Sequence, residues 1–268
     1  ALSPAGRYVL GQMQLEAGLQ TQDRAAQQAG MEAMLTSGVA SPAVASQLLA
    51  NQAALALQGN AFDRAEQLMT RAAEAEPGNA MRLAQLAEIK LRLFQGARTA
   101  RASKRAEAVA LYARAVQMGE ASGRVLPESF YRRATAVAFD AQSPSALELG
   151  ERLVRRYPSP PNWRDVLLQL RDLNPNDAEL ALDVGRLMRR TGALAGERDH
   201  LELARALNDA GRAAEAKAVL DQGVQSGMVS ASEPQARDLI ARINPRAAAE
   251  RSGLAAQRNQ ARAAATGR

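Results

Sequence analysis

Bulky and small apolar positions recur along this chain with the period of an α-helix, and glycine or proline interrupts them at intervals. The stretch from residue 199 to residue 223 shows the pattern in full. One helix face carries such residues at i, i+3, i+4 and i+7, Gly211 breaks the period, and a second stretch restarts it, which predicts two helices joined by a turn. The positions on the two faces are His200, Leu203, Ala204, Leu207, Ala216, Leu220 and Gly223.

The same alternation predicts helix pairs along most of the chain. The first pair extends from about Pro4 to Gly38, and a second, opened by Ser41-Pro42, closes at Pro77. A third begins near Met81, and a fourth lies between Pro127 and Pro158. Proline suits the first turn of a helix and also stops one, so these boundaries agree with the periodicity.

Three places depart from the regular pattern. In the third pair the segment ARTARASKR, residues 97–105, predicts a connecting turn several residues longer than elsewhere, although a longer helix fits as well. Pairing stays open between Trp163 and Gly192, because Gly185 and Gly192 lie where a first helix would have them. After residue 230 the pattern predicts a short helix, a break at Pro245 and a long Ala- and Arg-rich helix.

A hairpin of about 25 residues cannot bury its own apolar face, so neighbouring hairpins must stack on it. Hydrophobic residues make up 47% of the 268 residues but aromatic residues only 3%, so Ala, Leu, Val and Met must supply the core. Runs of β-branched and aromatic residues with period two are absent from the sequence. We therefore predict an all-α fold, a right-handed α-solenoid of about six or seven hairpins over residues 1–244, followed by an Arg/Ala-rich C-terminal helix over 245–268 that could begin a further repeat.

The spacing of small and bulky residues resembles the tetratricopeptide repeat (TPR), a helical hairpin of 34 residues. Its second-helix pattern is matched by Ala65, Met69, Ala72 and Pro77. The strings YPSPPNW, RLMRRTGALAGERDHLELA and AGRAAEAKAVLDQGVQSG are similar to exported TPR proteins of Gram-negative bacteria. This resemblance implies a bacterial protein-binding scaffold or adaptor in the periplasm, with the cytoplasm as the alternative.

The residues that could support catalysis are few. The absence of cysteine excludes disulfides and thiolate metal sites. His200 is the sole histidine, and its position predicts a packing role. No phosphate loop, dinucleotide fingerprint or cluster of metal ligands occurs in the sequence. We expect a non-enzymatic protein without catalytic residues, metal or cofactor, and also without a transmembrane segment, since no run of about 18 apolar residues occurs.

In the TPR architecture the first helix of each hairpin lines a concave groove. The resemblance therefore implies that groove residues lie between the packing positions of first helices. In one unit they are Arg198, Leu201, Arg205 and Asn208, and in another they are Tyr131, Thr135 and Phe139. Two guanidiniums on one face predict a peptide or protein partner that carries acidic groups, since arginine forms paired hydrogen bonds to carboxylates.

A net charge of +6 raises nucleic acid as an alternative partner for an Arg-rich solenoid surface. The basic residues after Pro245 include Arg246, Arg251, Arg258 and Arg262, opposed only by Glu250. This segment has no aromatic residue to stack on a base, which favours the protein partner over nucleic acid. The two alternatives differ in salt dependence, because phosphate binding weakens steeply as ionic strength rises.

Overall fold

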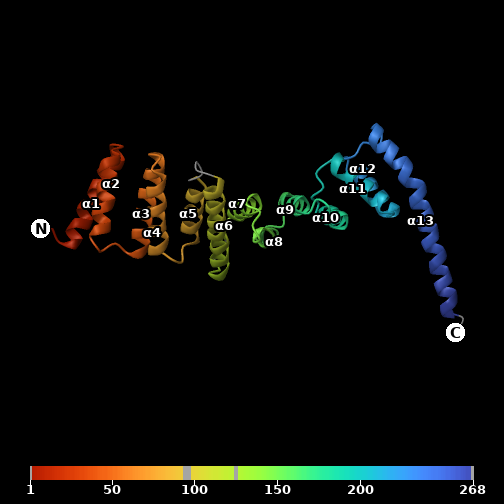
Figure 1. Ribbon diagram of the computed structural model, residues 1–268, viewed down its shortest axis with the longest axis horizontal. Helices are drawn as coiled ribbons and strands as arrows, with labels where there is room; N and C mark the ends of the chain where they lie inside the picture. Colours follow the sequence, from red (N-terminus) through yellow and green to blue (C-terminus); the bar gives the residue numbers. More distant parts are fainter. Residues whose placement is uncertain (1, 93–97, 124–125, 267–268) are drawn as a thin grey trace. The chain divides into compact units, whose positions relative to one another are not determined.

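The computed structural model describes residues 2–92, 98–123 and 126–266, and within them the chain forms thirteen α-helices and no strand. Backbone contacts divide the helices into two units, one ending at Leu153 and one beginning at Val154. From α1 to α7 and from α9 to α13, helices that follow one another in sequence pack side by side, as the ribbon shows (Figure 1). The predicted all-α fold of paired helices is confirmed for the described residues.

The first unit consists of seven helices and most of an eighth. In this unit α1 packs on α2, α3 on α4 and α5 on α6, while further contacts link α2 to α3, α4 to α5 and α6 to α7. The helices are α1 (Pro4–Gln20), α2 (Arg24–Thr36), α3 (Pro42–Gln58), α4 (Phe62–Ala75), α5 (Ala80–Arg92), α6 (Arg98–Ala121), α7 (Glu128–Asp140) and α8 (Ala146–Arg156).

The second unit resolves the pairing that the sequence left open. Here α9 packs on α10 and α11 packs on α12, so Trp163 lies on the first helix of one hairpin and Gly185 on its second. The final helix α13 packs on α12 and α11. The bounds are α9 (Pro160–Leu173), α10 (Ala178–Arg190), α11 (Glu197–Asp209), α12 (Ala213–Gln225) and α13 (Pro234–Thr266).

Ser-Pro dipeptides begin three of the helices. The hydroxyl oxygens of Ser3, Ser41 and Ser159 accept hydrogen bonds from backbone N–H groups in the first turns of α1, α3 and α9. The following proline occupies the first helical position, where its missing N–H leaves no helical hydrogen bond unmade. The boundaries predicted at Pro4 and at Ser41-Pro42 therefore have a direct capping cause.

Several glycines let helix backbones touch. A Cβ atom built on Gly30 of α2 would lie 2.5 Å from the backbone nitrogen of Leu15 and 2.6 Å from the backbone oxygen of Gly11 on α1. Neither backbone atom can move aside without shifting its helix. A Cβ on Gly223 of α12 would meet the His200 ring of α11 at 2.9 Å. These contacts hold the helices of a hairpin closer together than larger residues would permit.

The core of the second unit has the composition that the sequence predicts. Leu203, Leu207 and Leu220 are 6%, 0% and 2% exposed, and they belong to one continuous apolar cluster between α9 and α13. His200 is also buried, and its Nδ1 lies 2.9 Å from the backbone oxygen of Gly196. The predicted packing positions of this hairpin, including that of His200, are confirmed.

The predicted break at Pro245 is wrong, because α13 continues through that residue to Thr266. Proline removes one helical hydrogen bond, but it lies on the exposed side of α13. The opposite side is buried before and after it, at Ala236, Leu239, Ile243 and Ala247. Packing on α12 and α11 on both sides of the proline outweighs the lost bond, so residues 245–266 extend α13 and do not start a separate helix.

The long turn predicted over residues 97–105 is also wrong for the part that the structure describes, since α6 begins at Arg98, whereas residues 93–97 lie outside the described residues. Charged contacts stabilise this early part of α6. Lys104 Nζ lies 3.0 Å from Glu66 Oε1 on α4, and Lys90 of α5 binds Glu66 and Glu107. The cluster joins α4, α5 and α6, so the longer-helix alternative holds.

The N-terminus of α12 is capped by a residue from α13. The residue before α12, Arg212, makes no side-chain capping bond. A carboxylate oxygen of Glu250 instead accepts the backbone N–H of Ala214 at 2.8 Å. A negative charge at this end of a helix also interacts favourably with the helix dipole. Glu250 thus fixes α13 against the last hairpin.

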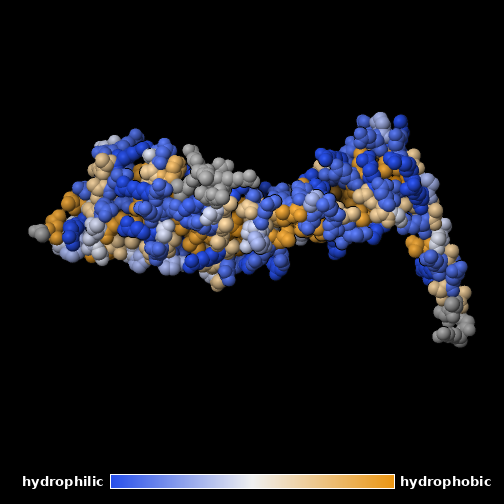
Figure 2. All heavy atoms as spheres, viewed as in Figure 1, coloured by the Kyte–Doolittle hydropathy of each residue, from blue (hydrophilic) through white to orange (hydrophobic). Residues whose placement is uncertain are grey.

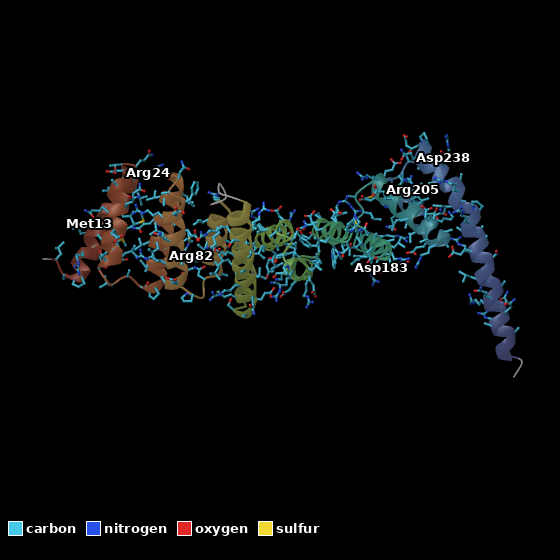
Figure 3. The ribbon with its side chains drawn as sticks, in the orientation of Figure 1. Met13, Arg24, Arg82, Asp183, Arg205 and Asp238 are labelled. Atoms are coloured by element: carbon cyan, nitrogen blue, oxygen red, sulfur yellow. The ribbon has the colours of Figure 1, made fainter. Side chains whose placement is uncertain are left out.

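Apolar side chains of α1 are exposed, including Val9 and Met13 at 48% and 63%. Figure 2 shows hydrophobic residues at the surface at this end of the chain, and Met13 is labelled in Figure 3. Val9 and Met13 lie opposite Gly11 and Gly18, which face α2.

None of the helices that the structure describes combines the length and apolar character needed to cross a membrane.

We predict that Gly30→Ala destabilises the protein, because the added Cβ would overlap backbone atoms of α1. The expected loss is about 1–3 kcal/mol in the free energy of unfolding, measured by urea denaturation. Gly78→Ala is the matched control, since a Cβ there meets no atom within 4 Å. Equal stability of both variants and the parent would contradict the close-contact interpretation.

Candidate functional site

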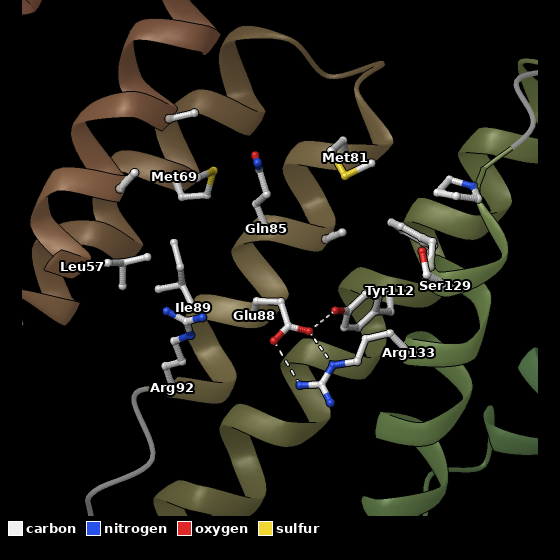
Figure 4. A pocket seen from close by; sticks show the side chains of 15 residues that line it. Leu57, Met69, Met81, Gln85, Glu88, Ile89, Arg92, Tyr112, Ser129 and Arg133 are labelled. Carbon is white, nitrogen blue, oxygen red and sulfur yellow. Dashed lines mark hydrogen bonds and ion pairs between the residues drawn. The ribbon is translucent and has the colours of Figure 1, made fainter. Parts of the chain in front are cut away.

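A groove in the first unit has a mostly apolar lining. Its volume is about 390 Å³, and the first helices of three consecutive pairs, α3, α5 and α7, supply most of its surface (Figure 4). The residues that line it are Ala50, Ala54, Leu57, Met69, Met81, Ala84, Gln85, Glu88, Ile89, Arg92, Tyr112, Pro127, Ser129, Phe130 and Arg133.

The floor of this groove is apolar. Leu57 and Ala54 project from α3, Met69 from α4 and Ile89 from α5, and Met81 at one side is 43% exposed. Alanines on α3 and α5 leave the volume unfilled, since a larger residue there would occupy it. An open apolar surface of this kind loses water favourably when a hydrophobic side chain covers it.

One wall of the groove is an ionic and hydrogen-bonded group of three residues. Arg133 Nε donates to Glu88 Oε1 at 2.6 Å and its Nη2 donates to Oε2 at 3.0 Å, while the hydroxyl of Tyr112 donates to the same carboxylate (Figure 4). Burial alone would raise the pKa of Glu88, but the hydrogen bonds from Arg133 and Tyr112 outweigh it and lower that pKa. The wall ties α5, α6 and α7 together with its charges already satisfied.

The structure brings three of the predicted site residues in the second unit to one depression. Arg198, Leu201 and Arg205 line it together with Glu197 and Glu202 of α11 and residues 233–235 at the start of α13. Arg198 is 87% exposed at its side chain, and its Nε donates to Glu202 Oε1 at 2.6 Å. Three glutamates, including Glu233, line the same depression, so the two predicted arginines belong to a surface of mixed charge.

The other predicted site residues are buried. Asn208 is 6% exposed, its Nδ2 donates to Asp209, and its Oδ1 accepts a hydrogen bond from Arg246 of α13. On α7, Tyr131, Thr135 and Phe139 are 2%, 3% and 7% exposed. These four side chains pack inside the fold, and a ligand at the surface could reach them only if the surrounding helices moved.

Within the described part of the chain, no group of three or more His, Asp or Glu residues could hold a metal ion. The buried His200 ring packs on Gly223. The groove in the first unit contains one carboxylate, Glu88, and Arg133 holds it in its charged form.

The groove could not be predicted from the sequence, because apolar residues of its floor also fit packing positions of their own helices. Met69, for example, matches the TPR pattern and is buried. The signal that could have found the groove is the set of small residues Ala50 and Ala54 on α3 and Ala84 on α5, all of which line it. Small residues at matching positions of successive first helices leave space, but only the structure shows that no larger side chain fills it.

Comparisons with known proteins give distant structural likenesses. No protein-family model matches the sequence, and no curated protein matches it. A solved structure of PilF from Pseudomonas aeruginosa aligns with 89% of this chain and 97% of its own, at 15% identity and a TM-score of 0.40. Acl4, an assembly chaperone of RpL4, aligns with 95% and 100%, at 13% identity and 0.36.

A third similar structure is the TPR2AB domain of yeast Sti1 in complex with pHSP90. It covers 91% of this chain and 95% of its own, at 14% identity and a TM-score of 0.28. These values are too low for the partner of any of the three proteins to be transferred to this chain.

We predict that the Glu88–Arg133 pair makes stability depend on pH. Because the folded pKa of Glu88 lies below its ordinary value of about 4.3, its contribution is present above that pH and is lost as pH falls through the folded pKa. Arg133→Met should therefore lower the free energy of unfolding at pH 7, and its difference from the parent should shrink towards pH 3. Urea denaturation across this range measures the difference.

The exposed Arg114 of α6 provides the control, since Arg114→Met removes the same charge without touching Glu88. A stability difference for Arg133→Met that stays constant from pH 7 to pH 3 would show that Glu88 does not carry the effect.

Proposed function

We propose that this protein is a non-enzymatic interaction scaffold that binds a segment of a partner protein in the groove between α3, α5 and α7. The observation that carries the proposal is the apolar floor left open by three consecutive first helices. A scaffold of this kind needs no catalytic residue, metal or cofactor.

The groove suits one bulky apolar side chain of a partner, such as leucine, methionine or phenylalanine. Fully burying such a side chain contributes about 1.5–3 kcal/mol, which supports a specific but reversible contact. The wall of Glu88, Tyr112 and Arg133 requires no charged group from the partner, because Arg133 and Tyr112 already donate hydrogen bonds to the Glu88 carboxylate. Arg92 and Ser129 are exposed at the rim, where they can contact the backbone of the bound segment.

The depression beside α11 remains a second candidate surface for an acidic peptide. Arg205 is exposed and has no ion pair within the described residues, and Leu201 lies next to it in the same depression. Arg198 is nearly fully exposed and already bound to Glu202, so its contact with a ligand would gain little. We place the main binding site in the first unit for this reason.

Peptide selection tests the groove. A displayed library of random peptides, selected on the whole protein, should yield peptides with one bulky apolar residue in common. Ala54→Arg, at an exposed position that lines the groove, should weaken binding of a selected peptide at least about tenfold in fluorescence anisotropy.

The matched control is Ala43→Arg, which adds the same side chain at an exposed position of α3 that does not line the groove. It should change the affinity by less than about twofold. Failure to select any peptide, or binding that Ala54→Arg leaves intact, would sink the groove proposal.

A second candidate function, nucleic-acid binding, rests on the distribution of charge. Residues 242–268 carry five of the six net positive charges. On α13 no residue from 248 to 263 is fully buried, and Arg251 and Arg258 are exposed seven positions apart, which places them on one side of the helix. A phosphate backbone could lie along that side.

Binding of a DNA duplex of about 20 base pairs at several salt concentrations tests this candidate. If the two arginines contact phosphates, the double variant Arg251→Gln/Arg258→Gln should make the slope of log affinity against log salt shallower by about 1.8. An unchanged slope, or no binding at low salt, would eliminate the candidate.

A further inference from the structure

Arg82 of α5 is a buried cation without a carboxylate partner among the described residues. It is 7% exposed and lies between the second and third hairpins (Figure 3). Its guanidinium donates three hydrogen bonds, from Nε to Ser46 Oγ at 3.0 Å, from Nη1 to Gln85 Oε1 at 2.9 Å and from Nη2 to Gln47 Oε1 at 2.6 Å. All three acceptors are neutral.

The guanidinium group determines the orientation of the two glutamine side-chain amides. Arginine has only donors, so the amide atom that faces Arg82 must be oxygen in both Gln47 and Gln85. The Nε2 of Gln47 then donates to Asn51 Oδ1 at 2.8 Å. One buried charge thereby fixes the orientation of three side-chain amides, and it leaves the NH₂ groups of Gln85 and Asn51 without an acceptor among the described residues.

Gln85 connects this network to the binding groove. It lines the groove and projects from α5 between Met69 and Met81 (Figure 4). At this position the groove presents the NH₂ group of Gln85, a hydrogen-bond donor, next to a positive charge that burial keeps from being screened by water.

We propose that Arg82 is a positioning residue that selects acidic segments for the groove. A bound segment would place its apolar side chain on the floor and a neighbouring Asp or Glu carboxylate against the Gln85 amide. The carboxylate accepts the Gln85 N–H and gains from the positive charge behind it, whereas a lysine or arginine at that place meets a donor and a like charge. This inference rests on the proposed function, because it concerns a ligand of the same groove.

An array of capped octapeptides tests the proposal, each with a central leucine flanked by Glu, by Gln or by Lys. The parent protein should bind the Glu series about tenfold more tightly than the Lys series, as expected for hydrogen bonds to a charged group. In Arg82→Met the preference should fall below about threefold, while affinity for the Gln series stays within about threefold of the parent. The exposed Arg71→Met of α4 removes the same net charge elsewhere and should keep the preference.

Two further measurements separate positioning from a general effect on folding. The side-chain amide NMR signals of Gln85 should shift when a Glu peptide is added to the parent, and this shift should be lost in Arg82→Met. If Arg82→Met does not fold, Gln85→Met removes the groove donor without removing the cation, and it should lower the same preference.

The outcomes distinguish this inference from the groove itself. If the leucine peptides bind but Glu and Lys flanks are equivalent in the parent, the role of Arg82 is refuted and the groove stands. Retention of the full preference in both Arg82→Met and Gln85→Met would also refute it. If no peptide in the array binds, the proposed function fails as well.

Discussion

Contact between helix backbones at glycine and alanine is the constraint on which the rest of this structure depends. Gly11 and Gly30 bring α1 against α2, and Gly223 receives the ring of His200. Alanines such as Ala53, Ala65 and Ala72 are fully buried where larger residues would force the helices apart. Helices that lie this close together leave little space between them, so a chain with few aromatic residues can still fill its core. The same small residues leave the surface of α3 and α5 hollow, and the groove is the result.

The sequence predicted the helices and their buried faces well because both depend on neighbours within a few turns. Leu203, Leu207 and His200 could be assigned to the core from spacing alone. The continuous helix through Pro245 could not, since burial on both sides of the proline comes from contacts with other helices. Contacts with other helices also explain Tyr131 and Asn208. The resemblance to TPR proteins implied that both line a groove, but neighbouring helices bury them. The groove joins α3, α5 and α7, and a pattern read along one helix does not show what faces it from another.

Helix α5 is where the polar contacts of the first unit meet. Arg82 binds residues of α3, Glu88 joins α6 and α7, and Lys90 binds acidic residues of α4 and α6. Apolar packing between repeats tolerates sliding, because one methyl group can replace another. A hydrogen-bonded charge does not, since its partners must lie at particular positions. These three residues therefore define how α5 sits among its neighbours, and the groove lies on the surface that they hold in place.

The cap that Glu250 places on α12 has a consequence for synthesis of the chain. The first turn of α12 lacks a side-chain partner of its own, and the residue that supplies one follows Ala214 by 36 positions. While the ribosome is still producing that intervening segment, the N-terminal N–H groups of α12 have only water as a partner. The last hairpin thus reaches its full stability only after Glu250 has emerged and α13 has docked, whereas the earlier hairpins capped by Ser3 and Ser41 carry their caps from the moment they leave the tunnel.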